Sequence, residues 1–421
     1  MDYMGGILVK KQIKVVIGAN FGDEGKGLTT EYFAVRHPNT LVVRFNGGAQ
    51  AAHTVVLPDS REHVFSHFGS GTLDGIPTYL SQFFLVNPIL YVEEREKLEQ
   101  KMKDQRTLPV LYVHRNAFVS TPYDMMINQI AELNRGEDRH GSCGYGISET
   151  VVRSEHEKYR ISVADLYDSR WLQEKLRSIK EEYVPRRLNE LGCRYISEDY
   201  TFGLTSHEVF DAFFHDCDIF KRTVCITDDS ILHAFDSIVF EGAQGLLLDQ
   251  NLIEYSPHIT HSNTGIDNVV EIMQNMDFDY EMEVVYVTRS YMTRHGAGPF
   301  PTETTDKPYR KIWDLTNVPN PWQGSLRFGI LDVDFLHKNV MKDVAKNTLP
   351  HVRNSLMVTC LDQIDDKAKY IVDGKLVETG IDEFLGRLRN KFGADWHIYQ
   401  SWGRTRNTVK CQDLVALEEK V

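Results

Sequence analysis

The sequence predicts an α/β fold, in which flanking helices cover a central, mostly parallel β-sheet and a P-loop-like phosphate loop follows the first strand. Three consecutive segments support this prediction. Residues 14–18 are a short apolar run that ends in glycine, residues 26–37 have a helical pattern, and residues 41–43 are a second apolar run followed by glycines. A strand, a loop, a helix and a strand in this order are typical of a parallel sheet.

Later strands are expected at short apolar runs that Gly, Asp, Ser or Arg follow. These runs are residues 109–114, 237–241, 282–288 and 356–360. Binding sites of open α/β sheets lie at the carboxyl ends of such strands. The intervening segment 155–235 has a mainly helical pattern, and 295–330 is rich in Pro and Gly. We therefore predict one domain, residues 1–421, with an inserted and mainly helical subdomain at about 155–235.

The composition is that of a globular protein, and it excludes several classes of function. The 421 residues are 42% hydrophobic, and 60 acidic against 47 basic residues give a formal charge of -13. This balance argues against a nucleic-acid-binding protein, which needs clustered Lys and Arg. We find no stretch of 18 apolar residues, no secretory signal pattern and no Cys-x-x-Cys pair among six cysteines. A cytoplasmic protein with free thiols and no membrane span is expected.

The first glycine-rich loop, residues 18–27, follows the first strand and opens a helix. Glycines let a backbone approach a phosphate, and the N-terminus of a helix binds anions. Lys26 would add a positive charge. The loop departs from a Walker A motif because it is longer and because Gly27 stands where Ser or Thr would hold magnesium. Asp23 and Glu24 in the same loop suggest that one acid binds magnesium or removes a substrate proton.

A second glycine loop, residues 47–54, follows the second strand and should lie beside the first. His53 comes after a run of small residues, where a backbone can approach a ligand closely. An imidazole in this place would hydrogen-bond a phosphoryl group in transfer. The alternative interpretation is an ordinary structural histidine.

Several blocks spread over most of the chain resemble those of the adenylosuccinate synthetase family. The first is Gly22-Asp-Glu-Gly-Lys-Gly27, and the others are the loop ending at Thr54, Phe240–Asp249, Thr260–Thr264, Thr293–Glu303 and Thr359–Asp362. The resemblance implies an ATP- or GTP-dependent ligase that couples L-aspartate to the 6-position of a purine nucleoside monophosphate through a 6-phosphoryl intermediate. It also implies that Asp23 is the base, that Asp23 and the Ala52 carbonyl bind Mg²⁺, and that His53 and Gln244 contact the reacting groups.

The same resemblance implies three groups of binding residues. Those for the triphosphate are Gly22, Glu24, Gly25, Lys26, Gly27, Thr54, Asp362 and Gly403. Those for the monophosphate are Asn20, Gln50, Ser142, Cys143, Arg153, Gln244 and Thr260. Those for aspartate are Gly324, Ser325 and Arg327. Arg153 would cross to the phosphate of a partner subunit, which makes a homodimer the expected assembly. A solvated surface arginine is the alternative interpretation of Arg153.

Three departures from the family pattern suggest a diverged branch. The second loop carries Gln50 and Ala52 in place of a His-Asn-Ala-Gly type run, only Arg327 remains of an arginine cluster at 322–329, and Cys360 replaces a lysine. These changes are compatible with the viral 2-aminoadenylosuccinate synthetases, which use dGMP. We therefore expect dGMP as acceptor, ATP, dATP or GTP as donor and, for a viral protein, the host cytoplasm. The alternatives are a synthetase that uses IMP and GTP, and a non-catalytic nucleotide-binding paralogue.

Overall fold

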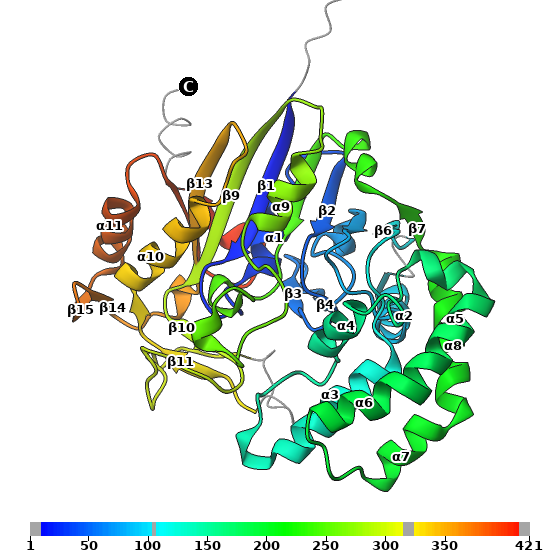
Figure 1. The fold of residues 1–421 in the computed structure, drawn as a ribbon. Coiled ribbons are helices and arrows are strands. Elements are labelled where there is room, and N and C mark those ends of the chain that lie inside the picture. Colours follow the sequence, from blue (N-terminus) through cyan, green and yellow to red (C-terminus); the bar gives the residue numbers. More distant parts are fainter. Residues whose placement is uncertain (1–9, 103–106, 315–323, 412–421) are drawn as a thin grey trace, which may run out of the picture.

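A ten-stranded sheet forms the centre of the computed structural model, which describes residues 10–102, 107–314 and 324–411 (Figure 1). In spatial order, its strands are β17 (Val409–Cys411), β16 (His397–Ser401), β13 (Val352–Thr359), β9 (Tyr280–Arg289), β1 (Lys11–Gly18), β8 (Ser237–Glu241), β2 (Thr40–Arg44), β5 (Thr78–Leu80), β6 (Leu111–His114) and β7 (Cys225–Thr227). Neighbouring strands of this sheet are parallel, except for the antiparallel pair of β16 and β17. The predicted fold class is confirmed.

Each of the six apolar runs predicted to be strands forms a strand of this sheet. The predictions missed β5, β7, β16 and β17, because these strands are short or lack a continuous apolar run. In β16, for example, buried Gln400 and Ser401 follow Tyr399, so the sequence of a buried strand looks polar. The predicted helix over 26–37 is α1 (Lys26–Ala34), which ends three residues earlier than expected.

Both faces of the central strands are buried, as a parallel sheet requires. Ile13, Val15 and Ile17 of β1 pack into the largest hydrophobic cluster, on the face that three helices cover. These helices are α9 (Asp267–Met273), α10 (Val333–Val344) and α11 (Ile381–Phe392). Val16 points to the opposite face and packs with Tyr32 of α1. Successive side chains of β1 thus point to opposite faces of the sheet, and helices pack on both of them.

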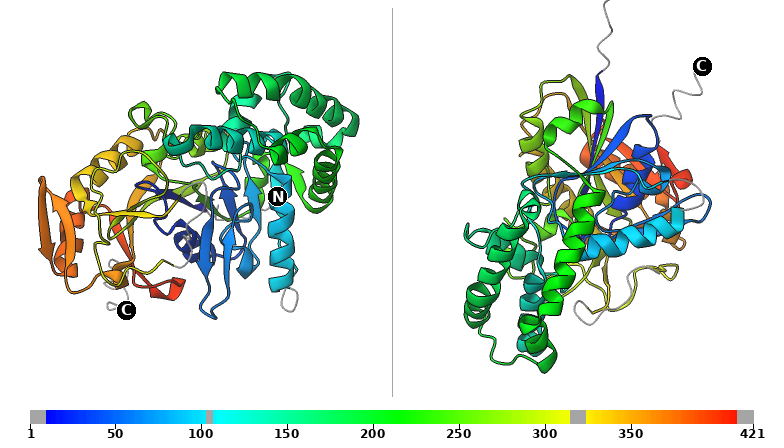
Figure 2. Two further views of the ribbon diagram at one scale, coloured as in Figure 1. Left: turned by 90° about the horizontal axis from the view of Figure 1, so that it is seen from below. Right: turned by 90° about the vertical axis from the view of Figure 1, so that its right-hand side faces the viewer.

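A mainly helical lobe extends from the β7 end of the sheet (Figure 2). Its helices are α3 (Pro122–Arg135), α4 (Ile147–Ser154), α5 (Ser169–Ser178), α6 (Val184–Glu190), α7 (Glu198–Thr205) and α8 (His207–Thr223), and α2 (Pro88–Met102) packs against α8. A second hydrophobic cluster joins these helices to β5 and β6. The described residues contain no helix with the length and apolar character needed to cross a membrane. The organisation as one domain stays a prediction.

Three small sheets complete the described structure. Their strands are β3 (His53–Val56) with β4 (Glu62–Phe65), β10 (Met292–Arg294) with β11 (Arg327–Gly329), and β12 (Leu331–Asp332) with β14 (Ala368–Val372) and β15 (Lys375–Thr379). β3 carries His53 at its first residue, and β10 follows β9 after a two-residue turn. The β3–β4 and β10–β11 pairs both lie next to the loop that follows β1, so they add residues to the carboxyl edge of the sheet.

Candidate active site

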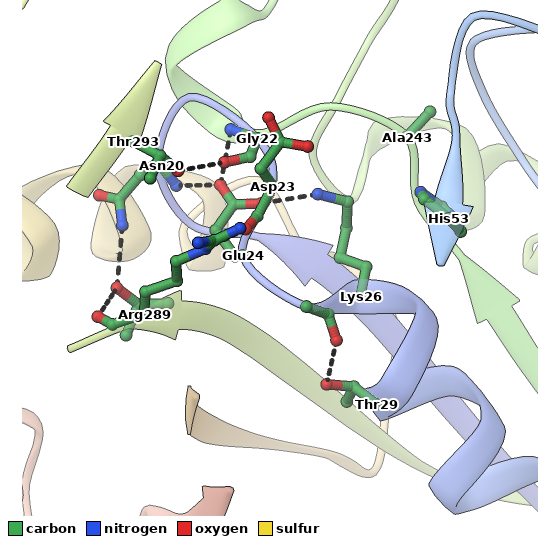
Figure 3. A network of polar contacts seen from close by, with 12 residues as sticks. Asn20, Gly22, Asp23, Glu24, Lys26, Thr29, His53, Ala243, Arg289 and Thr293 are labelled. Atoms are coloured by element: carbon green, nitrogen blue, oxygen red, sulfur yellow. Dashed lines mark hydrogen bonds and ion pairs between the residues drawn. The ribbon is translucent and has the colours of Figure 1, made fainter. Parts of the chain in front are cut away.

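The loop between β1 and α1 is organised around the buried carboxylate of Glu24 (Figure 3). Its Oε1 accepts hydrogen bonds from the backbone N–H of Asn20 at 3.1 Å and of Gly22 at 2.8 Å. Its Oε2 pairs with Lys26 Nζ at 2.6 Å. An ammonium has three N–H donors, so the pair with Glu24 fixes the position of Lys26 and occupies only one of them. Glu24 therefore shapes the loop rather than contacting a substrate directly.

Asp23 is the exposed acid of the loop. Its side chain is 28% exposed, against 2% for Glu24, and Figure 3 shows its carboxylate pointing away from the loop. The backbone of Asp23 has φ +61°, an uncommon conformation for a residue other than glycine. Arg289 Nε donates to its backbone oxygen and holds this conformation in place. Of the two acids that the sequence offered, Asp23 is the one that can meet a substrate or a metal ion.

The two glycine loops lie against each other, as the sequence analysis predicts. A Cβ atom on Gly27 would lie 2.8 Å from the backbone oxygen of Thr54 and 3.3 Å from Cβ of His53. Only a glycine permits this approach. His53 is therefore next to the N-terminus of α1, where backbone N–H groups favour an anion.

Glu241 at the end of β8 fixes the imidazole of His53, and the sequence analysis did not single it out. Nδ1 of His53 lies 2.7 Å from Glu241 Oε1, and the Ser70 hydroxyl donates to the same oxygen. The Ser70 backbone N–H donates to Oε2, and Arg44 Nε lies 4.0 Å from that atom. The only signal in the sequence was an acid at the end of a buried strand, within the block that begins at Phe240.

Burial and charge decide the protonation of this pair. Burial lowers the pKa of His53, an effect that Glu241 opposes and Arg44 reinforces. Burial raises the pKa of Glu241, but His53 and Arg44 outweigh this effect and hold it below its usual value. Glu241 is thus ionised, and His53 donates its Nδ1–H to it. This bond directs Nε2 of His53 into the site. A proton on Nε2, which a bound phosphate would favour, makes His53 a donor toward the site as well.

We expect Glu241→Gln to slow phosphoryl transfer by about 10- to 100-fold, the range for partners that orient functional histidines. The neutral amide removes the negative charge that favours a proton on Nε2 of His53, so the imidazole loses its donor toward the phosphoryl group. Single-turnover phosphoryl transfer measures the effect. Glu94→Gln is the matched control, since Glu94 is a buried carboxylate near His63 and His67 on another part of the structure. Equal slowing in both variants would contradict a specific role of Glu241.

A cavity of about 350 Å³ opens beside these loops, between the helical lobe and the glutamine loop that follows β8. Five of the predicted monophosphate-binding residues line it: Gln50, Ser142, Cys143, Gln244 and Thr260. Both amide atoms of Gln50 and Oε1 of Gln244 are buried without a hydrogen-bond partner among the described residues. Buried polar atoms are rarely left unpaired in proteins, so their presence at a cavity indicates a polar ligand.

Asn20 and Arg153 do not line this cavity, and their contacts lie within the chain. Asn20 is buried, and its Nδ2 donates to Thr288 Oγ1 at 2.9 Å. Arg153 is fully buried, and its three nitrogens bond Asp124 and the backbone oxygens of Val119 and Tyr159. Neither the predicted reach of Arg153 to a partner subunit nor the alternative of a surface arginine fits this burial. Arg153 therefore gives no support to the expected homodimer.

The predicted aspartate loop is only partly described, since residues 315–323 lie outside the described residues. Gly324 and Ser325 are exposed. Arg327 donates to Glu303 through Nε at 2.7 Å and to the backbone oxygens of Gly296 and Gly298 at 3.1 and 2.9 Å. Nη2 of Arg327 also donates to Glu303. These bonds use four of its five N–H groups, so Arg327 braces the 296–298 turn and has little left for a substrate carboxylate.

The predicted base-reading block lies at the end of β13, next to the phosphate loop. Thr359 Oγ1 donates to the backbone oxygen of Glu24 at 2.6 Å. Cys360 has φ +60°, and Asp362, two residues further along, is exposed. Gly403 follows β16, the parallel neighbour of β13, so the two segments emerge at the same edge of the sheet. This arrangement places Asp362 and Gly403 where a nucleotide base could lie beyond the phosphate loop.

His295 is a site residue that the sequence analysis did not identify. It belongs to the block Thr293–Glu303, lines the cavity, and places Nε2 3.5 Å from Asp23 Oδ2. Nothing in the sequence distinguished it from a histidine of an ordinary loop. The contact arises because Thr293 Oγ1 bonds the backbone oxygen of Gly22 at 3.2 Å and so ties the end of β10 to the phosphate loop.

The fold and these loops define a class of protein, the α/β nucleotide-binding proteins with a phosphate loop between the first strand and the first helix. The family model described as adenylosuccinate synthetase matches residues 15–419, and the chain belongs to the adenylosuccinate synthetase family. The viral branch stays a prediction.

Similar proteins carry the same family name. The adenylosuccinate synthetase of Marinomonas sp. is 33% identical over 309 residues, a match that spans 70% of this chain and 65% of that protein. The match thus covers slightly less than two thirds of that relative. The adenylosuccinate synthetase of Clostridium beijerinckii is 32% identical over 395 residues, covering 89% of this chain and 84% of that protein.

Two solved structures share the fold. Fully ligated adenylosuccinate synthetase from Plasmodium falciparum has a TM-score of 0.73 at 17% identity, covering 95% of this chain and 99% of that one. Cyanophage S-2L succinoaminodeoxyadenylate synthetase, bound to dGMP and dATP, has a TM-score of 0.58 at 15% identity, with coverage of 98% and 99%. At these identities the similarity supports the fold alone.

Proposed function

We propose that this protein is a carbon–nitrogen ligase that joins L-aspartate to the 6-position of a purine nucleoside monophosphate and hydrolyses a nucleoside triphosphate. The observation that carries the proposal is the position of Asp23. Its partly exposed carboxylate lies on the phosphate loop and 3.5 Å from Nε2 of His295, which lines the cavity that holds the unpaired amide atoms of Gln50 and Gln244. Family membership over residues 15–419 supports the same activity.

The first step makes the 6-oxygen a leaving group. Asp23 takes the proton from N1 of the purine, and the 6-oxygen attacks the γ-phosphorus of the triphosphate. The bond from the γ-phosphorus to the bridging oxygen breaks, and the diphosphate leaves. Lys26 and the N-terminus of α1 hold the phosphates, and His53 lies beside them for contact with the transferred group. Such a transfer depends mainly on alignment and on neutralisation of charge.

The second step forms the carbon–nitrogen bond. The amino group of aspartate attacks C6, the bond from C6 to the phosphorylated oxygen breaks, and phosphate leaves. The new secondary amine then releases a proton. Gln244, which has φ +55° and an unpaired buried Oε1, is the amide placed to orient the 6-position during both steps.

The residues present fit a magnesium ion. Mg²⁺ in phosphate sites is commonly bound by one or two carboxylates, with phosphate and water oxygens completing its shell. Asp23 supplies an exposed carboxylate, and the exposed Ala52 lies in the neighbouring loop. Both acceptor oxygens of Glu24 are already bonded, which leaves Asp23 as the acid for the ion. The ion would neutralise negative charge on the phosphates.

We favour dGMP as the acceptor, with IMP as the alternative. The departures at residues 49–52 and 322–329 and the fold shared with a cyanophage protein bound to dGMP support the first. The names of the relatives at 32–33% identity support the second. A competition assay with equal dGMP and IMP, aspartate and donor, read by product mass, tests both. A dominant IMP adduct would reject dGMP, and no aspartate adduct from either would leave only a nucleotide-binding role.

We expect adenine triphosphates to be used at least as well as GTP, because Cys360 stands where the family carries a lysine beside the base. Asp362 is exposed and is the remaining candidate to read guanine. The measurement is kcat/KM for ATP, dATP and GTP with one acceptor. A preference for GTP above about 100-fold, or about 2.7 kcal/mol, would contradict this expectation and make Asp362 the dominant contact.

A further inference from the structure

We propose that Tyr291 is a positioning residue that connects the turn at Asp362, where the donor base would lie, to the backbone of Asp23. The inference rests on the proposed function, since that function assigns the donor base to the first acid and the purine proton to the second. It adds a physical connection between the two nucleotide sites. The connection consists of three hydrogen-bonded side chains, Arg289, Tyr291 and Gln363.

Arg289 is the end of this connection that meets the phosphate loop. It is the last residue of β9 and is buried, and Figure 3 shows its side chain beside the loop that carries Asp23. Its Nε donates to the backbone oxygen of Asp23, whose positive φ requires support from its surroundings. Its Nη1 donates to Oη of Tyr291 at 2.8 Å, and its Nη2 donates to Asp314 at 3.2 Å. The guanidinium that holds the backbone of Asp23 is therefore itself held in part by Tyr291.

The direction of each hydrogen bond around Tyr291 follows from the donor groups. A guanidinium has no acceptor atom, so Oη of Tyr291 accepts from Arg289 and must donate its own proton to another group. Oη donates to Oε1 of Gln363 at 2.6 Å. Because Tyr291 is 1% exposed, water has little access to replace either bond. Tyr291→Phe would thus leave a donor of Arg289 and an acceptor of Gln363 unpaired, at a cost in free energy.

Gln363 places the other end of the connection in the turn that carries Asp362. The two residues are neighbours in one 3₁₀ turn, Leu361–Gln363, in which the backbone N–H of Gln363 donates to the backbone oxygen of Cys360 at 3.1 Å. The hydroxyl of Ser290 donates to the same oxygen at 3.0 Å, so the segment before Tyr291 lies against the turn. A donor base that contacts this turn would therefore restrain the position of Gln363.

The base and the phosphates of a donor would act on the phosphate loop by different routes. The phosphates would meet the loop directly, at Lys26. Thr359 also contacts the loop, through its bond to Glu24, but it belongs to β13 and precedes the turn. The base would act through the turn and Tyr291. A nucleoside triphosphate analogue supplies both parts of the donor, whereas inorganic tripolyphosphate supplies only the phosphates, so a comparison of the two isolates the effect of the base.

The test measures by calorimetry how each of these compounds changes the affinity for dGMP and for IMP. In the wild-type protein, the β,γ-imido analogue of ATP or of GTP should raise the acceptor affinity about fivefold or more beyond the effect of tripolyphosphate, a coupling of ordinary size. Tyr291→Phe and Gln363→Met should each remove this difference. The double variant should lose no more than either single variant, because both remove the same hydrogen bond.

Tyr309→Phe is the matched control. Tyr309 is also a buried tyrosine, its ring centroid lies 6.2 Å from that of Tyr291, and its hydroxyl bonds the backbone of Lys369. Both tyrosine variants lose a buried hydroxyl, so both should lower the melting temperature, but only Tyr291→Phe should remove the difference between the two compounds.

Three results would overturn the proposal. They are an equal loss of the difference in Tyr309→Phe, a difference that persists in Tyr291→Phe, and a wild-type protein in which the triphosphate analogues and tripolyphosphate change the acceptor affinity equally. A mass measurement of the aspartate adduct tests the proposed function separately. If no adduct forms while the calorimetric difference is present and depends on Tyr291, the proposed function fails and the connection between the two nucleotide sites stands.

Discussion

Asp23→Asn is expected to slow single-turnover phosphoryl transfer by about 100-fold or more, because removal of a general base typically has an effect of this size. The amide cannot accept the N1 proton, so the 6-oxygen stays a poor nucleophile. Nucleotide binding should largely survive, because Glu24 and Lys26 organise the phosphate loop and Asp23 contributes mainly its backbone to it. Rapid-quench measurement of the phosphorylated acceptor, with nucleotide affinity measured separately, tests both parts.

Glu24→Gln is the informative comparison for this variant. Its carboxylate accepts two backbone N–H groups and the Lys26 ammonium while buried, so the substitution should lower thermal stability and triphosphate affinity together. Asp23→Asn should leave the melting temperature unchanged. If Asp23→Asn keeps more than about a tenth of the transfer rate, Asp23 is not the base, since that residual rate is too high for loss of the proton acceptor.

His53→Ala is expected to have the second largest effect, a fall of about 10²- to 10³-fold in kcat, the usual result of losing one donor that stabilises a transferring group. In the proposed mechanism the imidazole contacts the phosphoryl group during transfer and not the resting monophosphate. The affinity for the acceptor should therefore change little, and the loss should appear in kcat rather than in KM. Steady-state and single-turnover kinetics with the preferred acceptor measure this difference.

His63→Ala is a matched control for His53→Ala. His63 is also a buried histidine beside a buried carboxylate, Glu94, but it lies on β4 outside the site. Both variants remove an imidazole from a packed position, so both should lower the melting temperature. Only His53→Ala should slow phosphoryl transfer. Comparable slowing in both would mean that His53 supports the packing of β3 rather than the reaction.

The sequence alone determined the core of the sheet and the presence of the phosphate loop. Strands β1, β2, β8, β9 and β13 are buried on both faces, so each must be a nearly continuous apolar run and is visible without a structure. The glycines of the first loop are required by its backbone, since Gly22 and Gly25 have φ +98° and +99°. Constraints of this kind act on single residues and their chain neighbours, so they can be recognised in the sequence.

The tertiary structure alone decided which polar residues face a ligand. Asp23 and Glu24 are adjacent acids in the sequence, and only the fold buries one against backbone N–H groups and exposes the other. The sequence suggested that Arg153 could reach a partner subunit, but the fold buries it against Asp124. His295 reaches Asp23 across more than 270 positions because β9 and β1 are neighbours in the sheet. Such contacts depend on strand order, which single residues do not encode.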